Sequence, residues 1–333
     1  MVKTIRNTIQ LPAILVKLSR NLRKQKKFLR NNIAPLLNQA SSTNDGTLTA
    51  KDFMKINRYY GLAVPAILGE AFCRLRRKPM SESERWASTS QGIITGLFDD
   101  FFDDLNLPQN LIVNMVEHPE NIVPGSSNEK LFLEFYLRTL KEAAHPNMIK
   151  QQFLLVNKAQ VASIEQENLN IKNDRIWEIT QKKGGDSVLF YRTAFDNLLA
   201  VGEKETLFQL GSLMQLENDI FDIYKDAQSK IATLPTTLSR VEYLRELYKK
   251  QIDLLIDLCY KMEYPKKQIR YFLDSVMPVI NRGFVCLDQY KRLEKTSAGI
   301  FDVNVYTRKQ LICDMEKAGN ILSAVKYQLM NQY

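Results

Sequence analysis

The sequence is poor in the residues that many enzymes use for acid-base or zinc chemistry. It has two histidines, His118 and His145, and each stands directly before a proline, where a helix junction is expected. Histidine catalysis and a zinc site are therefore disfavoured. The cysteines are few, far apart and without metal-ligand spacing, so we expect reduced thiols in the core of a cytoplasmic protein. They are Cys73, Cys259, Cys286 and Cys313.

Several sequence patterns that define other fold classes are missing. There is no glycine-rich phosphate or dinucleotide loop, no alternation of strand and helix and no repeat of fixed period. No stretch reaches the roughly 18 apolar residues of a membrane span, and the apolar patch at residues 11–18 is too short for a signal peptide. These absences exclude the common nucleotide-binding folds and a transmembrane chain.

Glycine and proline are also sparse, with 13 and 11 among 333 residues. Apolar residues recur at intervals of three and four, as in the series Leu244, Tyr248, Ile252, Leu255 and Cys259. The pattern predicts an all-α fold of nine to twelve helices. We expect breaks near residues 41–46, 78–83, 108, 118–127, 145–146, 184–185, 233–237, 264–265 and 297–303. The double glycine at 184–185, costly inside a helix, suggests a helix that bends.

Acidic residues are absent from the first 30 positions, which hold nine of the 46 basic residues. Without these nine, 37 basic residues face 37 acidic ones, so the net charge of +9 belongs to the N-terminal segment. This distribution argues against nucleic-acid binding. A basic segment with an apolar patch suits an anionic membrane surface, and a solvated, partly frayed helix is the plainer alternative.

The domain prediction follows from this charge distribution. We expect a basic helical segment over residues 1–40 and a single all-α domain over residues 41–333. Residues 1–30 are the candidate for peripheral membrane contact, and a homodimer is left open.

A first acidic cluster lies in the segment I-I-T-G-L-F-D-D-F-F-D-D-L at residues 93–105. On a helix, Asp99 and Asp103 share one face, as do Asp100 and Asp104, because residues four apart are neighbours. No lysine or arginine stands three or four residues from the cluster to relieve the repulsion. Its neighbours are apolar and aromatic, so we expect divalent cations to bind these carboxylates, with an exposed acidic helix end as the alternative.

A second polar stripe begins at Gly211 and follows the 4, 3, 4, 4 spacing of one helix face. Its members carry amide or carboxylate oxygens: Gln215, Asn218, Asp222 and Asp226. Local pairing of Asp222 with Lys225 and of Asp226 with Lys230 is the alternative explanation. Magnesium prefers a few carboxylates together with phosphate oxygens and water, so two such helices facing each other would form a diphosphate clamp.

The two acidic segments resemble the metal motifs of the class I isoprenoid and terpene synthase superfamily. D-D-F-F-D at residues 99–103 matches the D-D-x-x-D motif. N-D-I-F-D-I-Y-K-D at residues 218–226 is similar to N-D-x-x-S/T-x-x-K-E of terpene synthases, with aspartates replacing the hydroxyl residue and the glutamate. Through Gln215, Asn218, Asp222 and Asp226, the same segment also resembles the second motif of squalene and phytoene synthases. The resemblance spans about residues 55–240.

Departures from the family patterns separate the subfamilies. Chain-elongating synthases carry an arginine pair after the first motif, and here L-N-L-P-Q-N follows Asp104, which disfavours elongation. Phe221 and Lys230 stand where squalene- and phytoene-type enzymes usually have arginine, which weakens that assignment. Arg270 and Tyr271 match the late Arg-Tyr pair of terpene synthases, although they follow the second motif closely.

The resemblance implies a helical bundle around a central active-site cavity and a prenyl diphosphate substrate. The implied cofactor is Mg²⁺, three ions with the bound diphosphate. The metal ligands and catalytic residues would be Asp99, Asp100, Asp103, Asn218, Asp222 and Asp226. Lys183, Arg192, Gln215, Lys225, Arg270 and Tyr271 would bind the diphosphate. Phe98, Phe102, Tyr191 and Phe195 would line the hydrocarbon pocket, and Phe190, Phe221 and Tyr224 are further candidates.

Three functions remain open at this point. The first is a terpene synthase, a carbon-oxygen lyase that ionises and cyclises one prenyl diphosphate. The second is a squalene- or phytoene-type transferase that joins two, with chain elongation behind it. The third is a non-catalytic isoprenoid-binding relative, although an inactive site has no reason to keep four mutually repelling aspartates.

Overall fold

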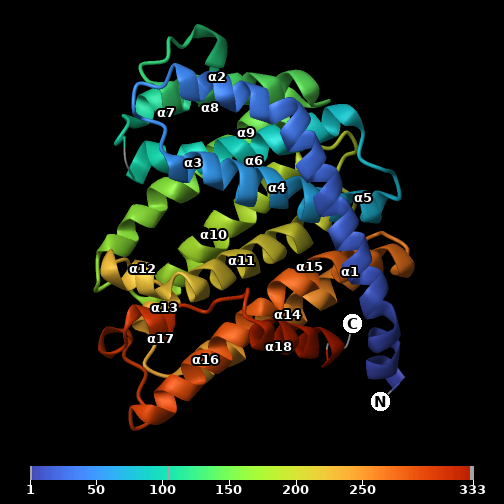
Figure 1. The fold of residues 1–333 in the computed structure, drawn as a ribbon, viewed down its shortest axis with the longest axis vertical. Helices are drawn as coiled ribbons and strands as arrows, with labels where there is room; N and C mark the ends of the chain where they lie inside the picture. The colour runs from blue at the N-terminus through green and yellow to red at the C-terminus, as the bar shows by residue number, and fades with distance from the viewer. Residues whose placement is uncertain (1, 104, 331–333) are drawn as a thin grey trace. The chain divides into compact units, whose positions relative to one another are not determined.

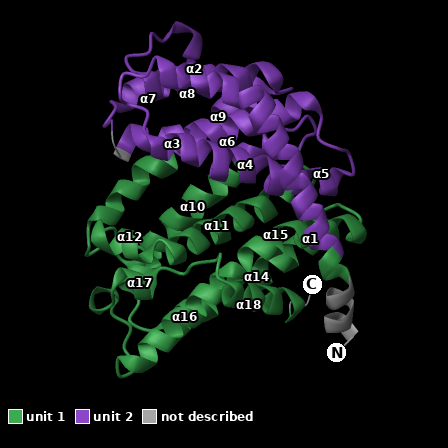
Figure 2. Ribbon diagram, in the orientation of Figure 1, with its two compact units in different colours: residues 1–12, 158–189, 199–333 green, residues 13–157, 190–198 purple. Residues whose placement is uncertain are grey.

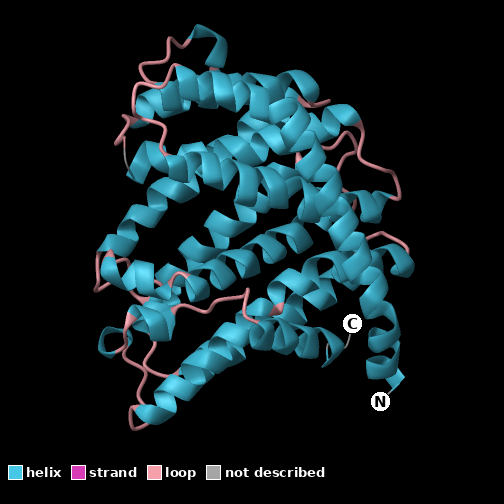
Figure 3. Ribbon diagram, in the orientation of Figure 1, coloured by secondary structure: helices cyan, strands magenta, loops and turns pink. Residues whose placement is uncertain are grey.

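The computed structural model describes residues 2–103 and 105–330, with the side chains of residues 10–102 and 105–330. Helices and the loops between them make up this part of the chain, and it contains no strand (Figure 3). The all-α fold class is therefore confirmed.

Fourteen α-helices in the described chain are longer than five residues (Figure 1). They are α1 (Val2–Phe28), α2 (Ala34–Ser42), α5 (Glu70–Arg76), α6 (Glu82–Asp103), α7 (Gln109–Glu117), α8 (Ser127–Glu142), α9 (Pro146–Ser163), α10 (Asn173–Arg192), α11 (Glu203–Phe221), α12 (Ile223–Gln228), α14 (Val241–Lys261), α15 (Lys266–Ile280), α16 (Arg282–Thr296) and α18 (Ala318–Met330).

Shorter helical turns connect several of these helices. The short α-helices are α3 (Ala50–Met54), α4 (Gly61–Ala63), α13 (Leu234–Thr237) and α17 (Arg308–Leu311). The π-helical stretches are η1 (Leu29–Ile33), η2 (Lys55–Tyr60) and η3 (Val64–Gly69). The 3₁₀ turns are η4 (Pro119–Asn121), η5 (Ile164–Glu167) and η6 (Val303–Val305). The described chain therefore has more helical segments than the predicted nine to twelve.

The chain forms two compact units (Figure 2). Unit 1 comprises residues 1–12, 158–189 and 199–333, and unit 2 comprises residues 13–157 and 190–198. The predicted division into a basic segment over residues 1–40 and one domain over residues 41–333 stays a prediction. The first acidic segment belongs to unit 2 and the second to unit 1.

Unit 2 is built around aromatic side chains that α6, α8, α9 and the end of α10 bring together. Phe101 and Phe132 lie 4.8 Å apart between ring centroids, and Phe153 and Phe190 stack at 4.9 Å. Phe98 contacts both Phe132 and Phe153. Large aromatic side chains supply most of the apolar area that a helix pair buries, so this cluster fixes the C-terminal half of α6.

Unit 1 has a core of α11, α14, α15 and α16. The predicted periodic series on α14, from Leu244 to Cys259, is buried at every position, as its spacing requires. Tyr248 on α14 donates a hydrogen bond to the Ile280 carbonyl, at 2.6 Å. All four cysteines of the two units are buried free thiols, as expected.

The double glycine is not a helix break, and that prediction is wrong. The helix α10 runs through Gly184 and Gly185 without interruption. A Cβ atom on Gly184 would lie 2.0 Å from the Gly211 carbonyl oxygen, and one on Gly211 would lie 2.1 Å from the Gly184 carbonyl oxygen. The glycines therefore allow the backbones of α10 and α11 to touch, and they place the polar face of α11 against α10.

Most of the other predicted breaks are confirmed. His118 ends α7 and His145 directly precedes α9, so both histidines lie at helix junctions. The loop at residues 193–202 between α10 and α11 was not predicted, because it contains only one glycine and no proline. Side-chain hydrogen bonds and ring contacts, described below, hold this loop in place.

Candidate functional site

The first acidic segment lies on the last turn of α6, where adjacent aspartates have different surroundings. Asp99 is partly exposed, and the Tyr60 hydroxyl donates to its Oδ2 at 3.5 Å. Asp100 is buried on the neighbouring face of the helix. Asp103 ends α6, and its side chain lies outside the described part of the chain, as does all of Asp104.

Asp100 already has a cationic partner. Lys55 Nζ lies 2.8 Å from Asp100 Oδ1 and 3.6 Å from Asp52 Oδ1. The side chains of Lys55 and Asp100 are only 17% and 4% exposed, so water screens this pair weakly. Burial raises the pKa of Asp100 to about 6, against the hydrogen bond and charge of Lys55. Lys55 bonds only Oδ1 of Asp100, and Oδ2 is buried without a hydrogen-bond partner in the described chain.

The predicted aromatic residues of unit 2 are largely packed in its core. Phe98 is buried, and its ring lies 5.3 Å from the ring of the half-buried Phe102. Tyr191 is buried and donates a hydrogen bond to Thr95 Oγ1 at 3.1 Å. Burial, together with the negative charge of Asp99, raises the pKa of the Tyr191 phenol. Tyr191 therefore lies close enough to the first acidic segment for the charge of Asp99 to affect its phenol.

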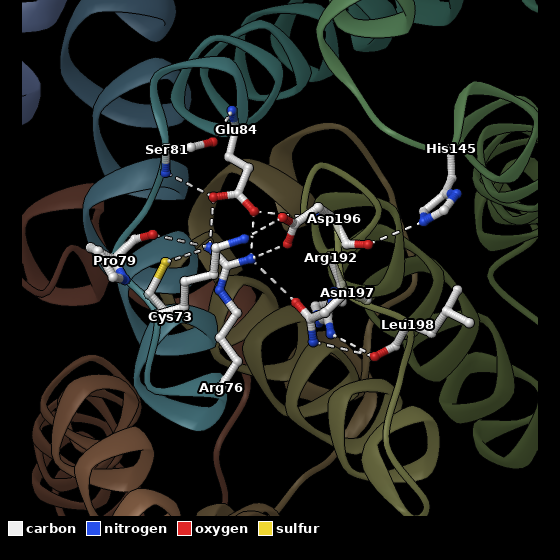
Figure 4. Close-up of polar contacts among 11 residues, drawn as sticks. Cys73, Arg76, Pro79, Ser81, Glu84, His145, Arg192, Asp196, Asn197 and Leu198 are labelled. Atoms are coloured by element: carbon white, nitrogen blue, oxygen red, sulfur yellow. Dashed lines mark hydrogen bonds and ion pairs between the residues drawn. The ribbon is translucent and has the colours of Figure 1, made fainter.

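Arg192 is the last residue of α10 (Figure 4), and Phe195 lies in the loop that follows. The Arg192 guanidinium donates to the carbonyl oxygens of Asn197 and Leu198 and lies over the Phe72 ring. Phe195 packs edge-on against the same Phe72 ring. These contacts hold the loop and bury the Arg192 side chain, and its predicted contact with the diphosphate stays a prediction.

A second arginine of unit 2 also binds this loop. Arg76 donates to both carboxylate oxygens of Glu84 and, at 2.8 Å, to Asp196 in the loop (Figure 4). Burial alone would raise the pKa of Glu84, but Arg76 and the backbone amides of Ser81 and Asp196 lower it to about 2. This network explains how a loop without proline keeps a defined conformation.

The second acidic segment is not one continuous helix, which corrects the predicted single stripe. The helix α11 ends at Phe221, and Asp222 has φ −90° and ψ 8° before α12 begins. Backbone hydrogen bonds still connect Asp222 to Asn218 and Asp226 to Asp222, at 2.8 and 2.9 Å. The helix axis is therefore interrupted at Asp222, while Asn218, Asp222 and Asp226 remain joined by i to i+4 bonds.

Asp219 is the buried carboxylate of this segment and was not among the predicted site residues. Gln215 Nε2 donates to it at 2.8 Å and the Thr180 hydroxyl at 3.2 Å. Burial raises its pKa to about 6, although Gln215, the charge of Lys183 and Thr180 favour the ionised form. Gln215 acts on Asp219 from the preceding turn of α11, whereas Lys183 acts on it from α10, across the close approach of the two helices.

Asp226 has a more strongly raised pKa than Asp219, so its ionised form is the more disfavoured of the two. Burial, followed by the negative charges of Asp219 and Asp222, raises the pKa of Asp226 to about 7. The positive charges of Lys225 and Lys183 only partly oppose this effect. Asn218 is exposed and donates weakly to Asp222, at 3.5 Å. The structure therefore brings together Lys183, Gln215, Asn218, Asp222, Lys225 and Asp226 in one charged region of unit 1.

Other cationic groups of unit 1 lie beside α11 or on α15. Arg282 pairs with the buried Glu217 at 3.2 Å and lies over the Phe221 ring. Burial raises the pKa of Glu217 to about 7 despite this partner. Neither Glu217 nor Arg282 was predicted, since their separation of 65 residues gives no sequence signal.

The remaining predicted residues of unit 1 have less specific surroundings. Arg270 lies on α15, and its Nε is buried without a hydrogen-bond partner in the described chain. Lys267 Nζ lies 5.9 Å from the ring centroid of Tyr271. Tyr224 on α12 is half-buried. Arg270 and Tyr271 stay predicted diphosphate-binding residues.

The donor groups fit magnesium in their chemistry. Asn218, Asp222 and Asp226 offer only oxygen atoms, which hard cations such as Mg²⁺ prefer. Burial first and then repulsion from Asp219 and Asp222 disfavour the ionised form of Asp226, and a bound cation would stabilise that form. Among the described residues, no three acidic, histidine or cysteine side chains are already gathered at metal-binding distances. Substrate phosphate oxygens would have to complete such a site.

Comparisons with known proteins add no family assignment. No protein-family model matches the chain, and no curated protein is similar to it in sequence. The resemblance to class I synthases therefore rests on the motif residues. Among the described helices, none combines the length and the apolar character needed to cross a bilayer.

Proposed function

We propose that this protein is a magnesium-dependent class I terpene synthase that ionises a prenyl diphosphate. The observation that carries the proposal is the charged region around the α11–α12 junction. Burial, followed by the negative charges of Asp219 and Asp222, raises the pKa of Asp226 to about 7, and two lysines compensate only in part. Such a region is costly to fold and becomes favourable when a cation binds it.

The ligands in this proposal come from both acidic segments. Asp99 and Asp103 of the first segment and Asn218, Asp222 and Asp226 of the second would hold the metal. Asp100 would keep α6 in place through Lys55. Asp219, held by Gln215 and Thr180, would orient the second segment. When bound, magnesium supplies Lewis-acid stabilisation of the departing diphosphate.

The reaction needs no protein nucleophile. The allylic carbon-oxygen bond would break heterolytically, and its electron pair would leave with the diphosphate oxygen. Lys183 and Lys225 would help to neutralise the leaving group, in a setting where fixed charges are worth more than in water. Loss of a proton from the carbocation would then give a neutral hydrocarbon. Aromatic faces stabilise such cations by roughly 0.5–2 kcal/mol each.

The test is incubation of the purified protein with magnesium and prenyl diphosphates of increasing chain length. Pyrophosphate release would be followed, and the organic phase would be analysed by mass spectrometry. We expect release with at least one substrate, together with a hydrocarbon derived from a single molecule. An Asp99→Ala, Asp103→Ala double variant serves as the control and should release no pyrophosphate above background.

The products also separate the alternatives. A hydrocarbon with the carbon count of two substrates would identify a squalene- or phytoene-type coupling enzyme. Saturable binding of a prenyl diphosphate without pyrophosphate release would indicate a non-catalytic binding protein. Failure of every substrate to bind or react with a folded protein would contradict the proposal.

A further inference from the structure

The first helix has one face that is fixed to unit 2. Gln25 is fully buried, and it donates to Thr89 Oγ1 at 2.9 Å while it accepts from Arg85 at 2.8 Å. Phe28 packs edge-on against Trp86, and Leu29 is buried one residue further on. These contacts join the C-terminal part of α1 to α6 and thereby define which side of α1 faces outward.

The outward side of the helix carries a row of cations. The row, called the basic stripe here, consists of Arg20, Arg23, Lys24, Lys27 and Arg30, all of which are exposed. Spacings of three, one, three and three residues keep these side chains on one face, opposite Gln25 and Leu29. At 1.5 Å of rise per residue the stripe is about 15 Å long.

The positive charge of the basic stripe has no acidic neighbour along the helix. The first acidic residue of the chain is Asp45, so no carboxylate occupies an i−4 or i+4 position. Cations four residues apart, such as Arg20 with Lys24 and Arg23 with Lys27, destabilise a helix. An external anionic surface would attract these cations and thereby offset their mutual repulsion.

The exposed apolar residues indicate the nature of that surface. Leu15 and Val16 lie just before the stripe and are 46% and 68% exposed. Sites for single-stranded nucleic acid combine cations with aromatic side chains on which bases stack. The only aromatic residue between positions 13 and 30 is Phe28, which is already packed against Trp86. Cations beside exposed aliphatic side chains suit the charged and apolar layers of a bilayer surface.

We propose that the basic stripe, with Leu15 and Val16, docks unit 2 onto the surface of an anionic lipid bilayer. The proposal depends on the N-terminal helix alone and is independent of the catalytic function proposed above. Clusters of four to eight basic residues on an amphipathic helix are typical of such contacts, and each cation adds to the affinity.

The test is co-sedimentation of the full chain with lipid vesicles. We expect binding to vesicles of equal parts phosphatidylcholine and phosphatidylglycerol, and none to pure phosphatidylcholine. An Arg20→Gln, Lys24→Gln, Lys27→Gln variant should lose roughly 100-fold in partition coefficient, because three surface cations are removed. Binding of the native chain should also weaken as salt is raised, through screening.

Matched variants separate the stripe from net charge. A Lys204→Gln, Lys250→Gln, Lys261→Gln variant removes the same charge from exposed positions of unit 1 and should bind as the native chain does. An Arg20→Lys, Arg23→Lys variant should retain binding, and Val16→Ser should weaken it less than the triple variant. Circular dichroism verifies that each variant is folded.

Three outcomes would overturn the proposal. The first is equal binding to neutral and anionic vesicles, and the second is equal loss of binding in the stripe and unit 1 variants. The third is absence of vesicle binding while an oligonucleotide binds and competes through the stripe, which would assign the surface to nucleic acid.

Discussion

The aspartates at the end of α6 and those at the α11–α12 junction look alike in the sequence but have different partners. In unit 2, the buried Asp100 is neutralised by Lys55 at 2.8 Å. In unit 1, burial followed by the negative charges of Asp219 and Asp222 raises the pKa of Asp226 to about 7, whereas the pKa of Asp100 beside Lys55 is about 6. The first segment thus contains a structural ion pair, whereas the second contains a carboxyl whose ionised form a bound cation would stabilise.

The same contrast holds for two buried glutamates paired with arginine. Glu84 in unit 2 accepts from Arg76 and from two backbone amides, and its pKa falls to about 2. Glu217 in unit 1 accepts from Arg282, and burial raises its pKa to about 7 despite this partner. The number of hydrogen bonds to the charged form, more than the presence of a counterion, decides the direction of the shift.

The largest expected stability effect is that of Lys55→Met. Removing the cation leaves Asp100 buried without its partner and should lower the free energy of unfolding by about 3–5 kcal/mol. Denaturant unfolding measures this value. Lys51→Met, at an exposed position of α3, is the matched control and should change stability by less than about 0.5 kcal/mol. Equal, small effects of both substitutions would show that the pair of Lys55 and Asp100 does not stabilise the fold. That result would contradict the contrast between the two acidic segments.

Gly184→Ala should destabilise unit 1 by about 1–3 kcal/mol, because the new Cβ would collide with the Gly211 carbonyl oxygen. Gly319→Ala, at a helical position of α18 with open space around it, should instead be neutral or stabilising by up to about 1 kcal/mol. Thermal unfolding compares the two variants. A native melting temperature for Gly184→Ala would contradict the close approach of α10 and α11.

The pH dependence should differ in sign between Asp226 and Glu84. The folded pKa of Asp226, about 7, lies above its usual 3.8, so its contribution to stability is complete below 3.8 and disappears as the pH rises through 7. Asp226→Asn should therefore stabilise the protein by about 1–2 kcal/mol at pH 8 and not at pH 4. Unfolding measured at both pH values without magnesium tests this.

Glu84 supplies the opposite case as a control. The contribution of Glu84 to the free energy of unfolding is complete above its usual pKa of 4.5 and disappears as the pH falls toward about 2. Glu84→Gln should destabilise the protein at pH 7 and less so in acid. If Asp226→Asn were destabilising at pH 8, the carboxylate would have a stabilising partner and the uncompensated charge inferred for unit 1 would be absent.

Local patterns predicted those features that depend on local physics. The periodic series on α14 identified buried positions correctly, and His118 and His145 marked helix junctions, because both signals act within one or two turns. The pairing of Lys55 with Asp100 and of Thr180 with Asp219 was not predictable, since 45 and 39 residues separate the partners. The predicted helix break at Gly184 was wrong for the same reason, because the role of Gly184 depends on Gly211 in another helix.

The most direct test of the proposed function is single-turnover pyrophosphate release at saturating magnesium from the substrate that the product assay identifies. Asp99→Asn and Asp222→Asn should each slow release by about 100- to 1,000-fold. Asp100→Asn should keep the rate within about tenfold of the native value while lowering stability, since Asp100 acts through Lys55. Native rates for both Asp99→Asn and Asp222→Asn would contradict the assignment of the two acidic segments to one diphosphate-ionising site.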